Sequence, residues 1–226
     1  MPSLTNDNEV YLLDLGAEEN RLHPDWMAEV NQLLDAVLAA PGPAALVSYG
    51  TGKFYSNGLD LAWLTEHVDQ FSRYLQDVQA LMARVVTLPV ATIAAVNGHA
   101  FGAGAMLALA HDARLMRTDR GYFCFPEVDI NLPFTPGMSA LIQAKLPPAA
   151  AIASMTTGRR FGGAEAVTAG LVDGSAAESD LLAAAIEQVR PLAGKDRATL
   201  GRIKSTMFDH AVQALLGSIE GDSDSR

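Results

Sequence analysis

The sequence predicts one α/β domain whose last third is helical. From residue 10 to about residue 135, short apolar runs typical of buried strands alternate with amphipathic helical segments, and from residue 136 the pattern is mostly helical. A chain of 226 residues with 49% hydrophobic content can bury a single large core. We expect a core at residues 1–145, a helical region at 146–219 that packs on it or on a neighbouring subunit, and a disordered tail at 220–226.

Each strand of the core is predicted by a short apolar run that meets turn residues. Residues 45–49 end in Gly50-Thr51-Gly52, and residues 91–96 lead into Asn97-Gly98. The runs at 10–15, 113–116 and 122–125 have the same strand-like character.

Helices are predicted by apolar residues at helical spacing and by prolines at the ends. Residues 23–40 carry Pro24 where a helix start tolerates it, and residues 71–88 are closed by Pro89. Residues 102–111 are small and apolar on nearly all faces, which indicates a buried helix. In the last third we expect helical segments at 136–146, 148–157, 163–169, 180–192 and 196–216.

Charge and composition argue against several kinds of partner. With a net charge of −10, the chain shows no sign of attraction to nucleic acid or to an anionic membrane. The N-terminus lacks the features of a signal peptide, and no apolar run reaches the roughly 18 residues of a membrane span. One cysteine, Cys124, and five scattered histidines offer no metal-ligand cluster. We therefore expect a cytoplasmic protein without a metal site.

Three motifs carry the chemical information in the chain. Residues 55–61 read YSNGLDL, residues 98–106 read GHAFGAGAM, and residues 125–132 read FPEVDINL. The two glycine-bearing turns suggest backbone amides aimed at one carbonyl oxygen, and the third motif places Glu127 in a largely apolar neighbourhood. Fixed N–H donors beside one carboxylate suit the formation and protonation of an enolate.

In this order and at these spacings, the motifs resemble those of the crotonase (enoyl-CoA hydratase/isomerase) superfamily, over residues 10–216. The later segment TTGRRFGGAEAVTAGLVD is similar to the family's alanine-rich helix that ends in Gly-Leu-Val. The resemblance implies a crotonase-like ββα superhelix core with a helical C-terminal region that forms trimers or paired trimers. It also implies an acyl-CoA thioester substrate, with CoA as part of the substrate and no separate cofactor.

By this resemblance, the two amides are those of Leu59 and Ala103. Ala103 opens a helix, whose unpaired amides favour negative charge. The residues expected to contact the ligand are Ser56, Asn57, Gly58, Leu59, Asp60 and Ala103. Arg21 or Leu22 is expected along the ligand. Three lysines either contact the CoA phosphates or are ordinary surface charges: Lys53, Lys145 and Lys204.

The acidic residues separate two reactions of this family. Its hydratases use two glutamates, but Met106 occupies the first position here and only the second, Glu127, is present. One base suffices to move a proton from C2 to C4 and so shift a double bond from the 3,4 to the 2,3 position. The chain is thus most similar to the Δ3-Δ2-enoyl-CoA isomerases, especially those of the plant type, and we expect burial to raise the pKa of Glu127.

Other interpretations stay open at this point. Glu127 could be a solvated surface residue, Asp60 is expected to cap the helix that follows it, and His99 to be a hydrogen-bonded structural residue. A different enolate-forming reaction, such as hydration or thioester hydrolysis, would need a second polar group, for which His99 and Asp129 are candidates. A non-catalytic acyl-CoA-binding protein would have Glu127 pointing away from the thioester.

Overall fold

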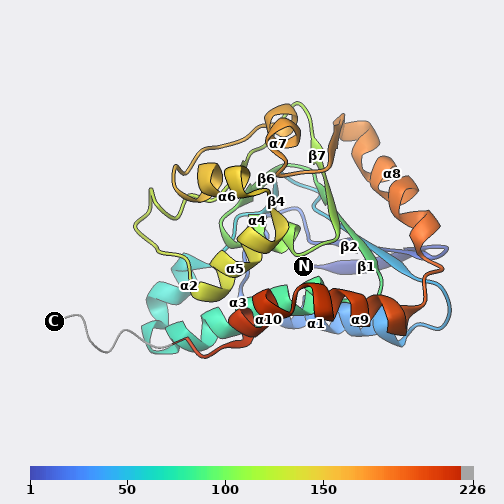
Figure 1. Cartoon of the computed structure of the whole chain (residues 1–226), viewed down its shortest axis with the longest axis horizontal. Coiled ribbons are helices and arrows are strands. Elements are labelled where there is room, and N and C mark those ends of the chain that lie inside the picture. Colours follow the sequence, from blue (N-terminus) through green and yellow to red (C-terminus); the bar gives the residue numbers. More distant parts are fainter. Residues whose placement is uncertain (220–226) are drawn as a thin grey trace.

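The core of the protein is a six-stranded sheet with helices on both faces (Figure 1). The computed structural model describes residues 1–219, so the tail predicted at 220–226 lies outside the described residues. The strands follow the order β1-β2-β3-β5-β7-β9; β1 and β2 are antiparallel and the other neighbours are parallel. Their bounds are β1 Ser3–Asp7, β2 Val10–Asp14, β3 Ala45–Tyr49, β5 Ala91–Val96, β7 Ala113–Arg117 and β9 Gly174–Ala176. The α/β class is confirmed.

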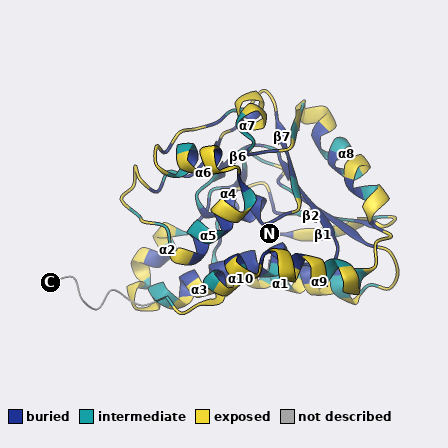
Figure 2. Cartoon of the chain, viewed as in Figure 1, coloured by how far each residue is buried: buried dark blue, intermediate teal, exposed yellow. Residues whose placement is uncertain are grey.

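The helices divide between the two faces of this sheet. In β3, Val47 faces the cluster that contains Leu181 of α8 (Glu178–Val189), whereas Leu46 belongs to the larger cluster on the other side. Because both faces are covered, every residue of β5 is buried. In Figure 2 the neighbouring strand β7 is likewise mostly dark blue, whereas exposed residues lie mainly on the helices and loops. The other helices are α1 Pro24–Ala39, α2 Leu61–Glu66, α3 Phe71–Val86, α4 Ala103–Leu109, α5 Pro136–Lys145, α6 Pro148–Met155, α7 Gly163–Ala169, α9 Arg197–Met207 and α10 Asp209–Leu216, with 3₁₀ turns at Val68–Gln70 and Arg190–Leu192.

A second, smaller sheet carries the sequence motifs. It consists of β4 (Phe54–Ser56), β6 (His99–Phe101) and β8 (Phe123–Cys124), in the order β4-β6-β8 and parallel throughout. The sequence predicts β8 but neither β4 nor β6, because a strand of three residues is too short to show an apolar period.

Most predicted elements are confirmed, and the differences have local causes. The segment 196–216 is two helices rather than one, because the chain leaves helical geometry at Phe208, whose side chain turns into the core at 8% exposure. β1 was not predicted because most of its residues are polar and exposed. β9 was not predicted because Gly174–Ala176 has no apolar pattern; it joins the C-terminal region to the main sheet through β7.

A buried chain of hydrogen bonds links the two sheets. The Ser48 hydroxyl in β3 lies 2.8 Å from the Tyr55 hydroxyl in β4 and 2.8 Å from Nε2 of His111. His111 Nδ1 donates to the Leu107 carbonyl in α4, 3.0 Å away, which leaves Nε2 to accept from Ser48. Burial lowers the pKa of His111 to about 4, so its ring is neutral at pH 7. The large sheet, the small sheet and α4 are therefore joined by fully paired polar groups.

Replacement of Gly104 should show how tightly α4 packs on β4. A Cβ on Gly104 would lie 2.4 Å from the Ser56 carbonyl oxygen, which is backbone and has little room to move. We expect Gly104→Ala to lower the free energy of unfolding by about 2 kcal/mol, measured by urea titration. Gly194→Ala is the matched control, because nothing lies within 4 Å of its Cβ. Equal stability of the two variants would contradict the close contact.

Candidate functional site

The three sequence motifs meet at one end of the small sheet. Because β4, β6 and β8 run parallel, the turns that follow them emerge at the same edge. β4 leads into Asn57-Gly58-Leu59, β6 into Gly102 and Ala103, and β8 into the segment that ends in Glu127. Strand topology thus brings together residues that are far apart in the sequence.

Glycines allow these turns to touch. Gly58 and Gly102 have φ values of +81° and +51°, in the region that glycine adopts without strain. A Cβ on Gly58 would lie 2.6 Å from the Phe101 carbonyl oxygen and 3.2 Å from the Ala103 nitrogen, and one on Gly102 would lie 3.1 Å from Glu127 Oε1. Each turn therefore lies directly against the next.

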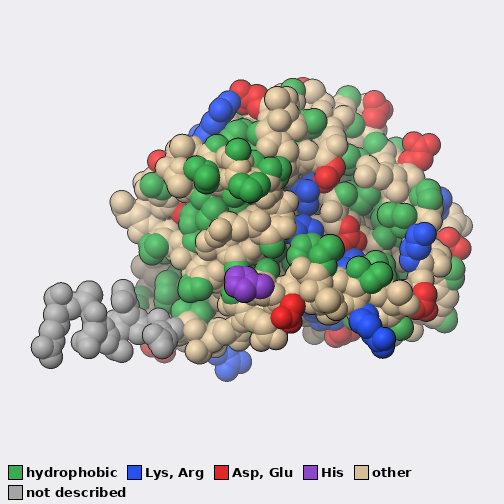
Figure 3. Space-filling view, viewed as in Figure 1, with side chains coloured by type: hydrophobic (Ala, Val, Ile, Leu, Met, Phe, Trp, Pro, Cys, Tyr) green, Lys and Arg blue, Asp and Glu red, His purple; other side chains and the backbone are tan. Residues whose placement is uncertain are grey.

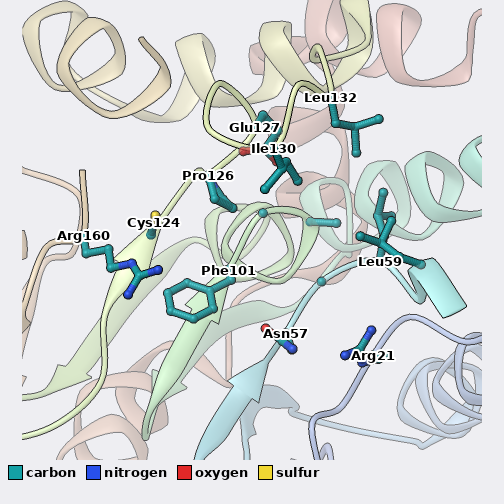
Figure 4. A pocket seen from close by; sticks show the side chains of 14 residues that line it. Arg21, Asn57, Leu59, Phe101, Cys124, Pro126, Glu127, Ile130, Leu132 and Arg160 are labelled. Carbon is teal, nitrogen blue, oxygen red and sulfur yellow. The ribbon is translucent and has the colours of Figure 1, made fainter. Parts of the chain in front are cut away.

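A cavity of about 250 Å³ opens where the turns meet (Figure 4). Leu59, Asn57 and Arg21 lie on one side of it, and Glu127 and Ile130 lie across from them. Among the described residues that line this cavity, Glu127 is the only acid. The full lining is Arg21, Asn57, Gly58, Leu59, Leu61, Phe101, Gly102, Ala103, Cys124, Pro126, Glu127, Ile130, Leu132 and Arg160.

Two backbone amides at the cavity are free to donate. Ala103 is the first residue of α4, so its amide has no acceptor within the helix. Leu59 follows the Gly58 turn, and neither amide donates a hydrogen bond to any of the residues that the structure describes. Both residues line the cavity, and the helix dipole of α4 adds positive potential near Ala103.

Glu127 is a buried acid at this cavity. Its exposure is 7%, and within residues 1–219 its Oε2 atom has no hydrogen-bond partner. Burial raises the pKa of the carboxyl group to about 7, against a smaller opposing effect of its own backbone amide. The interpretation of Glu127 as a solvated surface residue is therefore wrong. Near neutral pH this group can both accept and release a proton.

Ser56 and Asp60, which were expected to contact the ligand, lie outside the lining of the cavity. Ser56 is fully buried; its hydroxyl donates to the Asn20 carbonyl at 2.7 Å and accepts from the Gly58 amide at 3.2 Å. Asp60 caps α2 by accepting from the Trp63 amide at 3.2 Å, as predicted. Both residues shape the turn that holds Leu59.

The basic residues are placed differently from the sequence-based expectation. Arg21 lines the cavity, whereas Leu22 is buried in the core. Lys204 is neither a surface charge nor near the cavity, since its ammonium group is buried 2.6 Å from Asp112 Oδ2. The Lys145 ammonium lies 4.6 Å from the centre of the Phe208 ring, and Lys53 is exposed outside the lining.

Arg160 and Cys124 are cavity residues that the sequence did not reveal. Arg160 lies on the opposite side of the cavity from Arg21 in Figure 4, with its guanidinium 5.7 Å from the centre of the Phe101 ring. It reaches this position because Phe161 forms an isolated β-bridge with Phe123 of β8. No local pattern in the sequence marks Arg160 as a cavity residue, because its position depends on that bridge.

The described residues supply no second acid or histidine to the cavity. Met106 is completely buried and Asp129 is exposed; neither lines the cavity. His99 packs between the rings of Phe54 and Phe101, with centroid distances of 5.3 and 4.9 Å. Contrary to the expectation of a hydrogen-bonded imidazole, its Nδ1 is buried without a partner among residues 1–219.

The family model described as enoyl-CoA hydratase/isomerase matches residues 8–225. The chain belongs to this family. It is 39% identical to enoyl-CoA delta isomerase 3 of Arabidopsis thaliana over 186 residues, which cover 79% of this chain and 78% of that protein. It is 33% identical to peroxisomal enoyl-CoA delta isomerase 1 of the same plant over 231 residues, or 99% and 96% of the two chains. The resemblance of the sequence motifs to those of the crotonase superfamily is thereby confirmed as family membership.

Solved structures agree on the fold of this enoyl-CoA hydratase/isomerase family member. A probable enoyl-CoA hydratase from Mycobacterium tuberculosis superimposes with a TM-score of 0.89 at 24% identity, over 97% of this chain and 93% of that one. The crotonase fold is therefore shown. Of the helices in residues 1–219, none is long and apolar enough to cross a membrane.

Replacement of Glu127 should stabilise the ligand-free protein, and the size of this effect should depend on pH. The folded-state pKa of about 7 lies above the ordinary value of 4.5, so stability is highest below pH 4.5 and falls as pH rises through 7. Glutamine at position 127 cannot ionise, so the free energy of unfolding of Glu127→Gln does not fall in this pH range. We expect the variant to be more stable than wild type by up to about 3 kcal/mol at pH 8. Melting temperatures from pH 4 to pH 8 test this; a constant difference between the two proteins would contradict a raised pKa.

Proposed function

We propose that this family member is a Δ3-Δ2-enoyl-CoA isomerase, which converts a 3-enoyl-CoA to its 2-trans isomer. The observation that carries the proposal is that one buried acid, Glu127, lines the same cavity as two free backbone amides. The Arabidopsis relatives, which are named enoyl-CoA delta isomerases, support the same reaction.

In the first step, the Glu127 carboxylate takes a proton from C2 of the thioester. The electron pair of the C–H bond moves into the carbonyl system, and negative charge develops on the thioester oxygen. The amides of Leu59 and Ala103 donate to that oxygen and hold the charge more strongly than they hold the neutral carbonyl. Losing one such donor typically raises the barrier by about 3 kcal/mol.

In the second step, protonated Glu127 returns the proton to C4. The dienolate carries its charge on C2, C4 and oxygen, so protonation at C4 leaves the double bond between C2 and C3. No atom is gained or lost, and the carboxyl group ends in its starting state. A pKa of about 7 suits both transfers, because the group is a sufficient base in one step and a sufficient acid in the next.

Hydration is less well supported than isomerisation. Adding water to a double bond requires one group to activate the water and another to protonate carbon. Met106, His99 and Asp129, the positions considered for a second group, all lie outside the lining of the cavity. A purely binding role is also disfavoured, because it would have Glu127 pointing away from the ligand, whereas Glu127 lines the cavity.

The rest of the proposal concerns the CoA moiety and the assembly. Arg21 and Asn57 are proposed to contact CoA at the mouth of the cavity, where Arg21 offers positive charge although it pairs with Glu19 at 2.5 Å. CoA serves as part of the substrate, with no separate cofactor. A homotrimer or a dimer of trimers and a cytoplasmic location remain predictions.

The first test is conversion of 3-hexenoyl-CoA to 2-hexenoyl-CoA, run beside hydration of 2-hexenoyl-CoA. We expect isomerisation without comparable hydration, and a loss of about 10³-fold in kcat/KM for Glu127→Gln. Asp129→Asn is the matched control, because it removes an exposed acid two residues away that does not line the cavity. Hydration as fast as isomerisation, or full activity in Glu127→Gln, would refute the single-base mechanism.

The pH dependence of the reaction should report the same carboxyl group. Since the base must be ionised in the free enzyme, kcat/KM should rise tenfold per pH unit below about pH 7 and level off above it. An initial-rate profile from pH 5 to pH 9 measures this. A midpoint near the ordinary glutamate value of 4.5 would show that Glu127 is not buried in the active form.

A further inference from the structure

A second hollow adjoins the candidate site. It has a volume of about 840 Å³ and lies between the loop that follows β8, the start of α5 and the end of α6. Glu127 and Leu132 line both this groove and the smaller cavity, so the two spaces meet at these residues. Beyond them the groove passes Phe134, Ser139 and Met155.

The groove is apolar along most of its length. Apart from Glu127 at its inner end, the described residues that line it carry no charge. Several apolar side chains stand exposed in this region: Val128 and Ile130 on the loop are about half exposed, at 50% and 49%, and Ile152 of α6 is 66% exposed. In the space-filling view, apolar side chains gather over α6 and beside it (Figure 3). Such a surface fits a hydrocarbon chain better than a polar ligand.

The position of Glu127 fixes where the acyl chain would leave the cavity. If this carboxyl group returns a proton to C4, C4 must lie against it, and C5 begins beside the same residue. The groove starts there, and Leu132 forms the boundary between the two spaces. We infer that the groove receives the acyl chain from C5 onward, which makes long, unbranched 3-enoyl thioesters the preferred substrate class. This inference rests on the proposed isomerase function.

Ser139 offers a way to close the groove without touching the catalytic residues. It lies on α5, half-buried, and its side chain lines the groove but not the smaller cavity. A phenyl ring at this position would occupy space that the distal carbons need. Ala144 lies on the same helix, exposed and outside both linings, so Ala144→Phe adds the same ring where no acyl chain passes.

The experiment compares kcat/KM for 3-dodecenoyl-CoA and 3-hexenoyl-CoA in wild type, Ser139→Phe and Ala144→Phe. We expect wild type to favour the longer substrate by at least about tenfold, because each buried methylene adds to transition-state binding. Ser139→Phe should lose most of that preference through the longer substrate alone, and Ala144→Phe should retain it. A preference that is absent in wild type or unchanged in Ser139→Phe overturns the inference.

A binding measurement separates this inference from the proposed function. Calorimetric titration of Glu127→Gln with dodecanoyl-CoA and hexanoyl-CoA needs no turnover, and we expect the longer ligand to bind at least about tenfold more tightly. Adding Ser139→Phe should remove the difference; if it does not, the groove does not hold the chain. Activity on neither enoyl substrate, with chain-length-dependent binding intact, would instead refute the isomerase proposal and leave the groove as an acyl site.

Discussion

The candidate site depends on close backbone packing of β4 and the turn after it against β6 and the first turn of α4. A Cβ on Gly104 would lie 2.4 Å from the Ser56 carbonyl oxygen, and a Cβ on Gly58 would lie 2.6 Å from the Phe101 carbonyl oxygen. These contacts hold the amides of Leu59 and Ala103 at one cavity. Since backbone atoms make the contact, its geometry does not depend on side-chain rotamers, and donors fixed in this way need no reorganisation when charge develops.

The same packing explains why the Glu127 carboxyl group is buried and has a raised pKa. The segment that follows β8 reaches the cavity beside Gly102. A Cβ at position 102 would lie only 3.1 Å from Glu127 Oε1, so the turn and the carboxyl group are closely packed. Little water can reach the acid, so its neutral form is favoured and one oxygen is unpaired among the described residues. A group that destabilises the folded protein when ionised is typical of a position kept for chemistry rather than for stability.

How much could be predicted from the sequence differed between the two sheets. The bounds of β3 and β5 were predicted to the residue, because a strand covered on both faces is an uninterrupted apolar run between turn residues. β4 and β6 are specified by their neighbours and not by any period of their own. The burial of Lys204 is not predictable from the sequence, because lysine is rarely buried; here its ammonium group donates to the Val90 carbonyl and to Asp112 in the core.

In the candidate site, too, some residues can be predicted from local sequence and others cannot. Glu127 could be singled out, since an acid among apolar residues after a proline is a local signal. Arg160 could not, because its place in the cavity depends on the pairing of Phe161 with Phe123, a contact between segments that no local pattern encodes. What escaped prediction was long-range pairing of very short segments, in which sequence carries little information about partners.

The hydrogen bonds among Ser48, Tyr55 and His111 bear on how β4 finds its alignment. A strand of three residues makes few ladder bonds, so its backbone alone would tolerate sliding by one position. Such a slip would carry the Tyr55 hydroxyl away and leave buried polar groups unpaired, at a cost of about 1–3 kcal/mol for each. These buried hydrogen bonds thus fix the register of β4. The position of the Leu59 amide therefore depends on Tyr55, which lies two residues before the turn Asn57-Gly58-Leu59.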